Sequence, residues 1–179
     1  MPYRSKQQHS IIWRGYRRVP VVKLPYYQRH WVLDRGSLTK RLIQASNGQF
    51  NVNVTRQAWE IPSLDERRLL KLPAGQRALI REVWLLCYGD VWVKARSVIP
   101  QKALCGAEKQ LATLGSRPLG AFLFKSKTMR RGPLQIASFK NQQDQTISAR
   151  RSVFFLNHKP ILVSEFFMPV VFSSSVSAL

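Results

Sequence analysis

Two predicted β-hairpins constrain the fold of this chain more than any other feature. Segments 77–88 and 91–99 are rich in apolar residues and are separated by a short turn around Gly89. Tight turns of this kind join neighbouring antiparallel strands. A second pair of apolar segments, at 149–157 and 161–168, follows near the end of the chain. We therefore expect a mainly antiparallel sheet.

Helical patterns occupy four further segments, 24–31, 38–45, 101–114 and 121–125. Ser37 suits the N-cap of the second helix, and Gly115 suits the end of the third. We expect the last two helices to cover a pocket. The other expected elements are strands at 11–16, 49–56 and 134–139 and loops at 60–75 and 140–147. Hairpins with helices grouped to one side predict an α+β fold.

The length and composition fit a single domain. The chain has 179 residues, of which 45% are hydrophobic and 21% charged, and a chain of this size can bury a substantial core. Residues 1–30 hold seven Lys/Arg and no acidic residue. We expect a basic, partly disordered extension at 1–30, the folded domain at 31–170 and a short polar tail at 171–179.

No sequence feature indicates export or membrane insertion. The chain lacks an apolar run of the roughly 20 residues that a spanning helix needs. Its start is not followed by the apolar segment of a secretory signal. Two cysteines, Cys87 and Cys105, are too few for a disulfide framework, and we expect inert thiols. The cytoplasm is the expected compartment.

The net charge of +20 raises the question of a nucleic-acid partner, because excess lysine and arginine bind phosphate groups. The basic residues gather at 1–30 and 125–151 and are otherwise scattered. We find no zinc-finger spacing, aromatic RNA-binding motif or helix-turn-helix pattern. We expect a solvated basic surface and no nucleic-acid partner. The charge alone leaves attraction to an anionic membrane surface, to acidic partners or to RNA open.

Two isolated charges stand in otherwise apolar strands. Alternation puts Arg81 on the same face as Val83 and Leu85, and it puts Glu165 on the same face as Val163. A charge on such a face is costly to bury unless a partner or a ligand uses it. An arginine and a carboxylate facing one interior suit a small anionic ligand that must lose a proton. The pattern alone leaves a structural ion pair equally open.

Other catalytic groups are poorly represented. The three histidines, His9, His30 and His158, have no partner at metal-ligand spacing. The sequence has no Gly-x-Ser-x-Gly motif and no glycine-rich phosphate loop. Arg96 could face either the pocket or the surface. We expect no metal and no organic cofactor.

Six short blocks stand in order between residues 31 and 169. They are Ser37-Leu38-Thr39-Lys40-Arg41, Ile80-Arg81-Glu82-Val83, Arg96-Ser97-Val98-Ile99-Pro100, Leu114-Gly115-Ser116-Arg117-Pro118-Leu119-Gly120, Arg150-Arg151-Ser152, and Lys159-Pro160 with Ser164-Glu165-Phe166-Phe167-Met168-Pro169. In this order and spacing the chain resembles the chorismate lyase (chorismate pyruvate-lyase) family, the bacterial enzyme that opens ubiquinone biosynthesis.

The resemblance implies a single α+β domain, with a six-stranded antiparallel sheet and helical flaps covering a buried ligand cavity. It implies a monomeric oxo-acid-lyase that converts chorismate to 4-hydroxybenzoate and pyruvate without a metal or cofactor. Four ligand-contacting positions carry over: Leu38, Arg81, Leu119 and Glu165. Arg81 and Glu165 are the expected catalytic pair. The family commonly has methionine where Leu38 stands, a change that a backbone contact would tolerate.

We expect Arg81 to anchor the ring carboxylate of chorismate and Glu165 to lie near the opposite end, which bears the ether and the hydroxyl. Whether Glu165 acts as base, acid or hydrogen-bond acceptor stays open. The alternative function is a non-catalytic effector-sensing domain of the same fold, as in some bacterial transcription regulators. Such regulators add a DNA-binding segment, for which residues 1–30 are too few.

Overall fold

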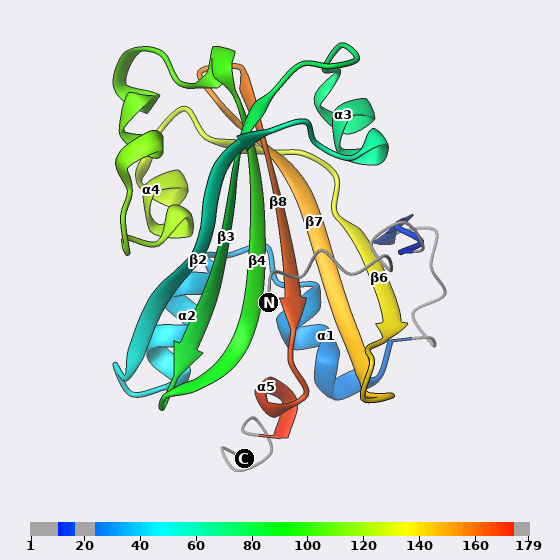
Figure 1. Cartoon of the computed structure of the whole chain (residues 1–179). Helices are drawn as coiled ribbons and strands as arrows, with labels where there is room; N and C mark the ends of the chain where they lie inside the picture. The colour runs from blue at the N-terminus through cyan, green and yellow to red at the C-terminus, as the bar shows by residue number, and fades with distance from the viewer. Residues whose placement is uncertain (1–10, 17–23, 174–179) are drawn as a thin grey trace.

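One antiparallel sheet runs through the computed structural model, which describes residues 11–16 and 24–173 (Figure 1). Its strand order is β1-β6-β7-β8-β4-β3-β2, and β5 pairs separately with β7. The strands are β1 (Arg14–Gly15), β2 (Phe50–Glu60), β3 (Ala78–Cys87), β4 (Asp90–Pro100), β5 (Arg130–Arg131), β6 (Gln135–Lys140), β7 (Thr146–Leu156) and β8 (Lys159–Phe167). The sheet therefore has eight strands, and the expectation of six is wrong. The two additional strands, β1 and β5, have only two residues each and pair with the edge of the six long strands or with β7.

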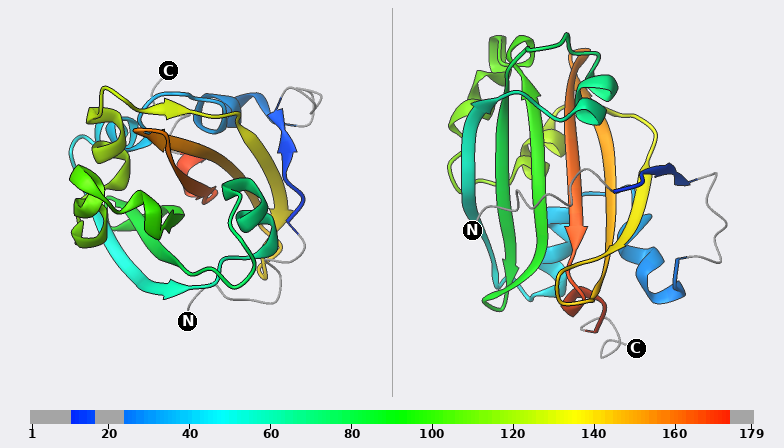
Figure 2. Two further views of the ribbon diagram at one scale, coloured as in Figure 1. Left: turned by 90° about the horizontal axis from the view of Figure 1, so that it is seen from above. Right: turned by 45° about the vertical axis from the view of Figure 1, so that its right-hand side comes forward.

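Helices cover both faces of the sheet (Figures 1 and 2). One face carries α1 (Tyr26–Val32), α2 (Leu38–Ala45), η4 (Gln101–Ala103), η5 (Gly106–Thr113) and α4 (Leu119–Lys125), and the last helix, α5 (Val170–Ser173), packs into the core of the same face. We call residues 101–125 the flap. The opposite face carries α3 (Leu64–Leu70), where Leu70 packs with Ile80 and Val98. The expectation that all helices group to one side is therefore wrong for α3.

The two predicted hairpins are confirmed, and their turns have the backbone that tight turns need. Gly89 between β3 and β4 has φ +86°. Asn157 and His158 between β7 and β8 have φ +48° and +64°, the left-handed values of a two-residue hairpin turn. The helix at 38–45 is also confirmed, and the Ser37 hydroxyl accepts a hydrogen bond from the Lys40 N–H at 3.3 Å.

Two predicted segments are wrong. The expected loop at 60–75 contains α3, whose start is closed by the Glu66 carboxylate accepting from the Ser63 N–H at 2.9 Å. The expected amphipathic helix at 101–114 is instead two 3₁₀ helices, η4 and η5. Gly106 explains the interruption, because its φ of +68° is incompatible with a continuous right-handed helix.

The predicted ends of the domain lie largely outside the described residues. Within 24–30, Leu24 and Gln28 are buried, and at the other end Val171 and Phe172 are buried. The limits at residues 30 and 171 stay predictions. Among the described residues, none of the helices is long and apolar enough to cross a membrane.

Candidate active site

A pocket lies between the sheet and the cover formed by α2 and α4. All four predicted ligand-contacting residues, Leu38, Arg81, Leu119 and Glu165, line it. Apolar side chains make up much of the rest of the wall, with Val52, Val83, Leu85, Ala95, Leu123, Phe124, Phe154 and Val163 among them. The structure thus brings together residues from four distant parts of the sequence, although their individual roles stay predictions.

Arg81 on β3 is a buried cation held by neutral oxygens. It is 1% exposed, and burial lowers the pKa of its guanidinium. It donates to the Gly115 carbonyl at 2.9 Å, the Arg117 carbonyl at 3.2 Å and the Gln57 side-chain oxygen at 3.2 Å. No carboxylate of the described residues forms an ion pair with it. Such a cation is well suited to an anionic ligand.

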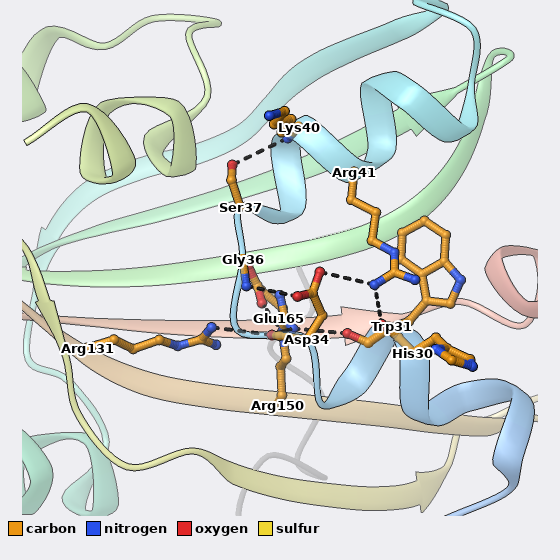
Figure 3. Close-up of polar contacts among 10 residues, drawn as sticks. All are labelled: His30, Trp31, Asp34, Gly36, Ser37, Lys40, Arg41, Arg131, Arg150 and Glu165. Carbon is orange, nitrogen blue, oxygen red and sulfur yellow. Dashed lines mark hydrogen bonds and ion pairs between the residues drawn. The ribbon is translucent and has the colours of Figure 1, made fainter.

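Glu165 on β8 is an ion-pair partner of Arg150 on β7 (Figure 3). The Arg150 Nε donates to Glu165 Oε2 at 2.5 Å, and Arg150 is 1% exposed. Arg150 also donates to the carbonyls of Trp31 at 2.9 Å and Asp34 at 2.5 Å. Glu165 therefore has a structural ion pair, and Arg81 is not its partner. This ion pair takes up only Oε2, so Oε1 is the oxygen left for a ligand.

Sequence reasoning missed Arg150, although a signal was present. Arg150 and Glu165 are Cα partners across the β7–β8 ladder. The turn at 157–158 fixes this register, because each step back along β7 is matched by a step forward along β8. Counting from the predicted turn would have placed an arginine directly beside the predicted glutamate.

Arg131 on β5 is a second missed cation of the pocket wall. It donates to the Ser152 hydroxyl at 3.1 Å and the Asp34 carbonyl at 3.4 Å (Figure 3), and its guanidinium lies 5.1 Å from the centre of the Phe154 ring. Burial and then the charge of Arg150 lower its pKa to about 10. It remains a cation near neutral pH.

Three arginines and one glutamate therefore line the pocket, namely Arg81, Arg131, Arg150 and Glu165. Their formal charges add to +2, which matches a ligand carrying two negative charges. Arg96, whose direction the sequence left open, lies on the other face of the sheet. There it binds Glu66 at 2.7 Å and Glu82 at 2.6 Å and takes no part in the pocket.

Leu38 and Leu119 are the first residues of α2 and α4, and both side chains are buried. The two helices approach closely beside them. A Cβ atom added to Gly120 would lie only 2.8 Å from the Thr39 hydroxyl oxygen, a distance that is too short for unbonded atoms. Glycine at position 120 therefore allows the flap to close against α2.

The flap is fastened to the β7–β8 turn by Glu108 of η5. This buried carboxylate accepts from Lys159 Nζ at 2.8 Å and from Asn157 Nδ2 at 2.7 Å. The hydrogen bond from Lys159 is the main cause that lowers the pKa of Glu108. These bonds hold the flap from outside the pocket, whereas Arg81 holds it from within the pocket wall.

Comparison with known proteins assigns the family. A model of the family described as chorismate lyase matches residues 10–177. The chain belongs to the chorismate lyase family. A protein from Methylococcus capsulatus named "Probable chorismate pyruvate-lyase" is 43% identical over 159 residues, covering 83% of this chain and 98% of that protein. A relative of the same name from Pseudomonas putida is 33% identical over 181 residues, covering 98% and 97%.

Solved structures resemble this chorismate lyase family member in fold alone. The C-terminal domain of the histidine utilization repressor from Pseudomonas syringae pv. tomato has a TM-score of 0.56 at 8% identity, covering 68% of this chain and 92% of that chain. PhnF from Mycobacterium smegmatis has a TM-score of 0.56 at 11% identity, covering 77% and 66%. At such identities the likeness carries no statement about ligand or activity.

Proposed function

We propose that this protein is a chorismate lyase that eliminates pyruvate from chorismate to give 4-hydroxybenzoate, the first step of ubiquinone biosynthesis. The observation that carries the proposal is the buried Arg81 guanidinium, which lines the same pocket as Glu165 and has only neutral oxygens as its hydrogen-bond partners. Membership of the family supplies the substrate.

The first step is binding of the chorismate dianion in the pocket. Arg81 binds the ring carboxylate, because a guanidinium can donate two parallel hydrogen bonds to a planar carboxylate. Leu38 and Leu119 flank the ring at the starts of α2 and α4, where apolar side chains and backbone N–H groups are both available. The formal charge of +2 on the pocket side chains balances the two carboxylates of the substrate.

We assign the second carboxylate, on the enolpyruvyl group, to the arginines at the Glu165 end of the pocket. Arg131 is the stronger candidate, because its hydrogen-bond partners Ser152 and Asp34 present neutral oxygens. Arg150 is already engaged by Glu165. Binding both carboxylates would orient the ether bond between the two ends of the pocket.

The chemistry requires little of the protein, since the ring gains aromatic stability. The ring carbon that bears the hydroxyl loses its proton, the neighbouring carbon–oxygen bond to the enolpyruvyl group breaks with its electron pair going to the oxygen, and the departing enolate takes up a proton at its terminal carbon to become pyruvate. No electrons are exchanged with an outside group, so we propose that no metal or organic cofactor takes part. Glu165 Oε1 lies at the proposed reacting end and can accept the hydroxyl hydrogen bond or the ring proton.

The proposal also includes the setting in which the enzyme acts. We infer a cytoplasmic monomer with no nucleic-acid partner, whose net charge of +20 permits weak contact with anionic membrane surfaces. Light scattering on a size-exclusion column would test the monomer. Co-sedimentation with vesicles, with and without anionic lipid, would test the membrane contact.

The experiment that tests the function is formation of pyruvate and 4-hydroxybenzoate from chorismate by the purified protein. Equal amounts of both products are expected, without added metal and in the presence of a chelator. An effector-sensing domain would bind 4-hydroxybenzoate and leave chorismate intact, and that result would overturn the proposal. The comparisons do not favour this alternative, since the lyase relatives cover nearly the whole chain.

A further inference from the structure

Gln57 on the edge strand β2 is the direct neighbour of Arg81 in the sheet. The two residues are Cα partners in the β2–β3 ladder. The Gln57 side-chain oxygen accepts from Arg81 Nη1 at 3.2 Å, and its side-chain nitrogen donates to the Ala112 carbonyl at 2.8 Å. Ala112 belongs to η5 in the flap. One amide group therefore bridges the ligand-binding arginine and the flap.

A bulge in β2 places this amide on the pocket side. Before the bulge, the even-numbered Val52 and Val54 pair with Leu85 and Val83 and share their face. The register then shifts between residues 54 and 56, and from there the odd-numbered Gln57 pairs with Arg81. If Thr55 were paired in a regular ladder and formed no bulge, strict alternation would turn Gln57 to the opposite face.

The same region of the flap is held by Arg81 itself, through the carbonyls of Gly115 and Arg117. Arg81 and Gln57 together therefore hold residues 112–117 of the flap. Within residues 11–16 and 24–173, Gln57 is the only group that both donates to the flap and accepts from Arg81. An amide can do both, whereas a carboxylate lacks a donor and an aliphatic side chain lacks both groups.

We propose that Gln57 is a positioning residue, which ties Arg81 to the closed flap and thereby sets both the affinity of Arg81 for a carboxylate and the rate at which the ligand leaves. The proposal rests on the proposed function, because it takes 4-hydroxybenzoate as the ligand. Gln57 itself is exposed at the rim of the sheet, so its replacement leaves the core intact.

Two substitutions separate the roles of the amide. Gln57→Glu puts a negative charge beside Arg81, where it competes with the ligand carboxylate, and we expect the Kd for 4-hydroxybenzoate to rise by about tenfold or more. Gln57→Leu adds no charge but removes the bond to the flap. Because this variant loses one hydrogen bond of ordinary net strength, we expect it to release 4-hydroxybenzoate about two- to tenfold faster.

A comparison of a charged with a neutral ligand excludes general damage to the protein as the cause of weaker binding. In Gln57→Glu, both ligands lose the contribution of the flap bond, but the affinity for 4-hydroxybenzoate should fall by about tenfold more than the affinity for neutral 4-hydroxybenzamide, since the electrostatic competition concerns only the carboxylate. Asn53→Asp is the matched control, because Asn53 lies on the same strand, is exposed, and pairs with Trp84 on the opposite face. It should change neither affinity.

Unchanged 4-hydroxybenzoate affinity in Gln57→Glu, or equal weakening of both ligands, would overturn the proposal, and so would unchanged release in Gln57→Leu. Failure of the unaltered protein to bind 4-hydroxybenzoate would instead overturn the proposed function on which the inference rests. Calorimetric titration gives the affinities, and stopped-flow displacement of bound ligand gives the release rates.

Discussion

Replacement of Arg81 by alanine gives the most direct test of the ligand anchor. A carboxylate bound by two charge-assisted hydrogen bonds gains about 3–6 kcal/mol, at about 1.5–3 kcal/mol each. Arg81 also donates to the carbonyls of Gly115 and Arg117, so part of that gain replaces bonds that the protein makes itself. We therefore expect a net loss of about 2–4 kcal/mol, which raises the Kd for 4-hydroxybenzoate by about 30- to 700-fold.

Titration calorimetry with 4-hydroxybenzoate is the assay, and Arg81→Lys should lie between alanine and arginine because lysine keeps the charge but loses the two-pronged geometry. The matched control is Arg130→Ala, which removes an exposed cation next to the pocket residue Arg131. An Arg81→Ala protein that binds within about threefold of the unaltered protein, with a Tm changed by less than about 4 °C, would refute the reasoning.

Three further predictions concern the other charged groups. Glu165→Gln keeps the shape of the side chain but removes its titrating group, so kcat should fall by about 10²-fold or more while 4-hydroxybenzoate still binds; unchanged turnover would eliminate an acid–base role. Arg131→Gln should raise the KM for chorismate by about tenfold or more and alter 4-hydroxybenzoate affinity far less, since the product lacks the enolpyruvyl carboxylate; equal effects on both would remove this arginine from the second-carboxylate site. Lys159 lowers the pKa of Glu108, so their contact contributes stability above pH 4.5, the ordinary value for the carboxyl group, and loses it as the pH falls below that value. The protection of η5 amides against hydrogen–deuterium exchange, taken relative to the intrinsic rate at each pH, should fall over that acidic range, and Lys159→Met should lack this protection already at neutral pH; identical protection in the two proteins would show that the pair does not fasten the flap.

The strongly patterned parts of the fold were predictable from the sequence. The hairpin around Gly89 and the Ser37-capped helix depend on local chemistry, which a few neighbouring residues determine. The helix α3 was not predicted, because prolines within 60–75 favour a loop. The capping pair of Ser63 and Glu66 was the signal that indicated a helix there. The single helix expected before Gly115 failed because Gly106 adopts a left-handed backbone.

The pocket was predictable in part. Strand alternation correctly brought Arg81 and Glu165 to one face of the sheet, and the turn register would have added Arg150. Arg131 could not be found in this way. It reaches the wall through β5, a strand of only two residues, and so its position depends on how the chain folds back after the flap. Nor does any alternation rule anticipate that Gln57 changes face.

The bulge at residue 55 lets β2 lose one residue without changing which side chains face the ligand. Deleting Thr55 would leave Val54 paired with Val83 and Arg56 with Glu82, as they are now, and would turn the interrupted ladder into a regular one. Gln57 would still pair with Arg81 and stay on its face of the sheet. A relative with a one-residue gap at this point would therefore present the same wall to its substrate, whereas a gap further along the strand would invert the residues that follow it.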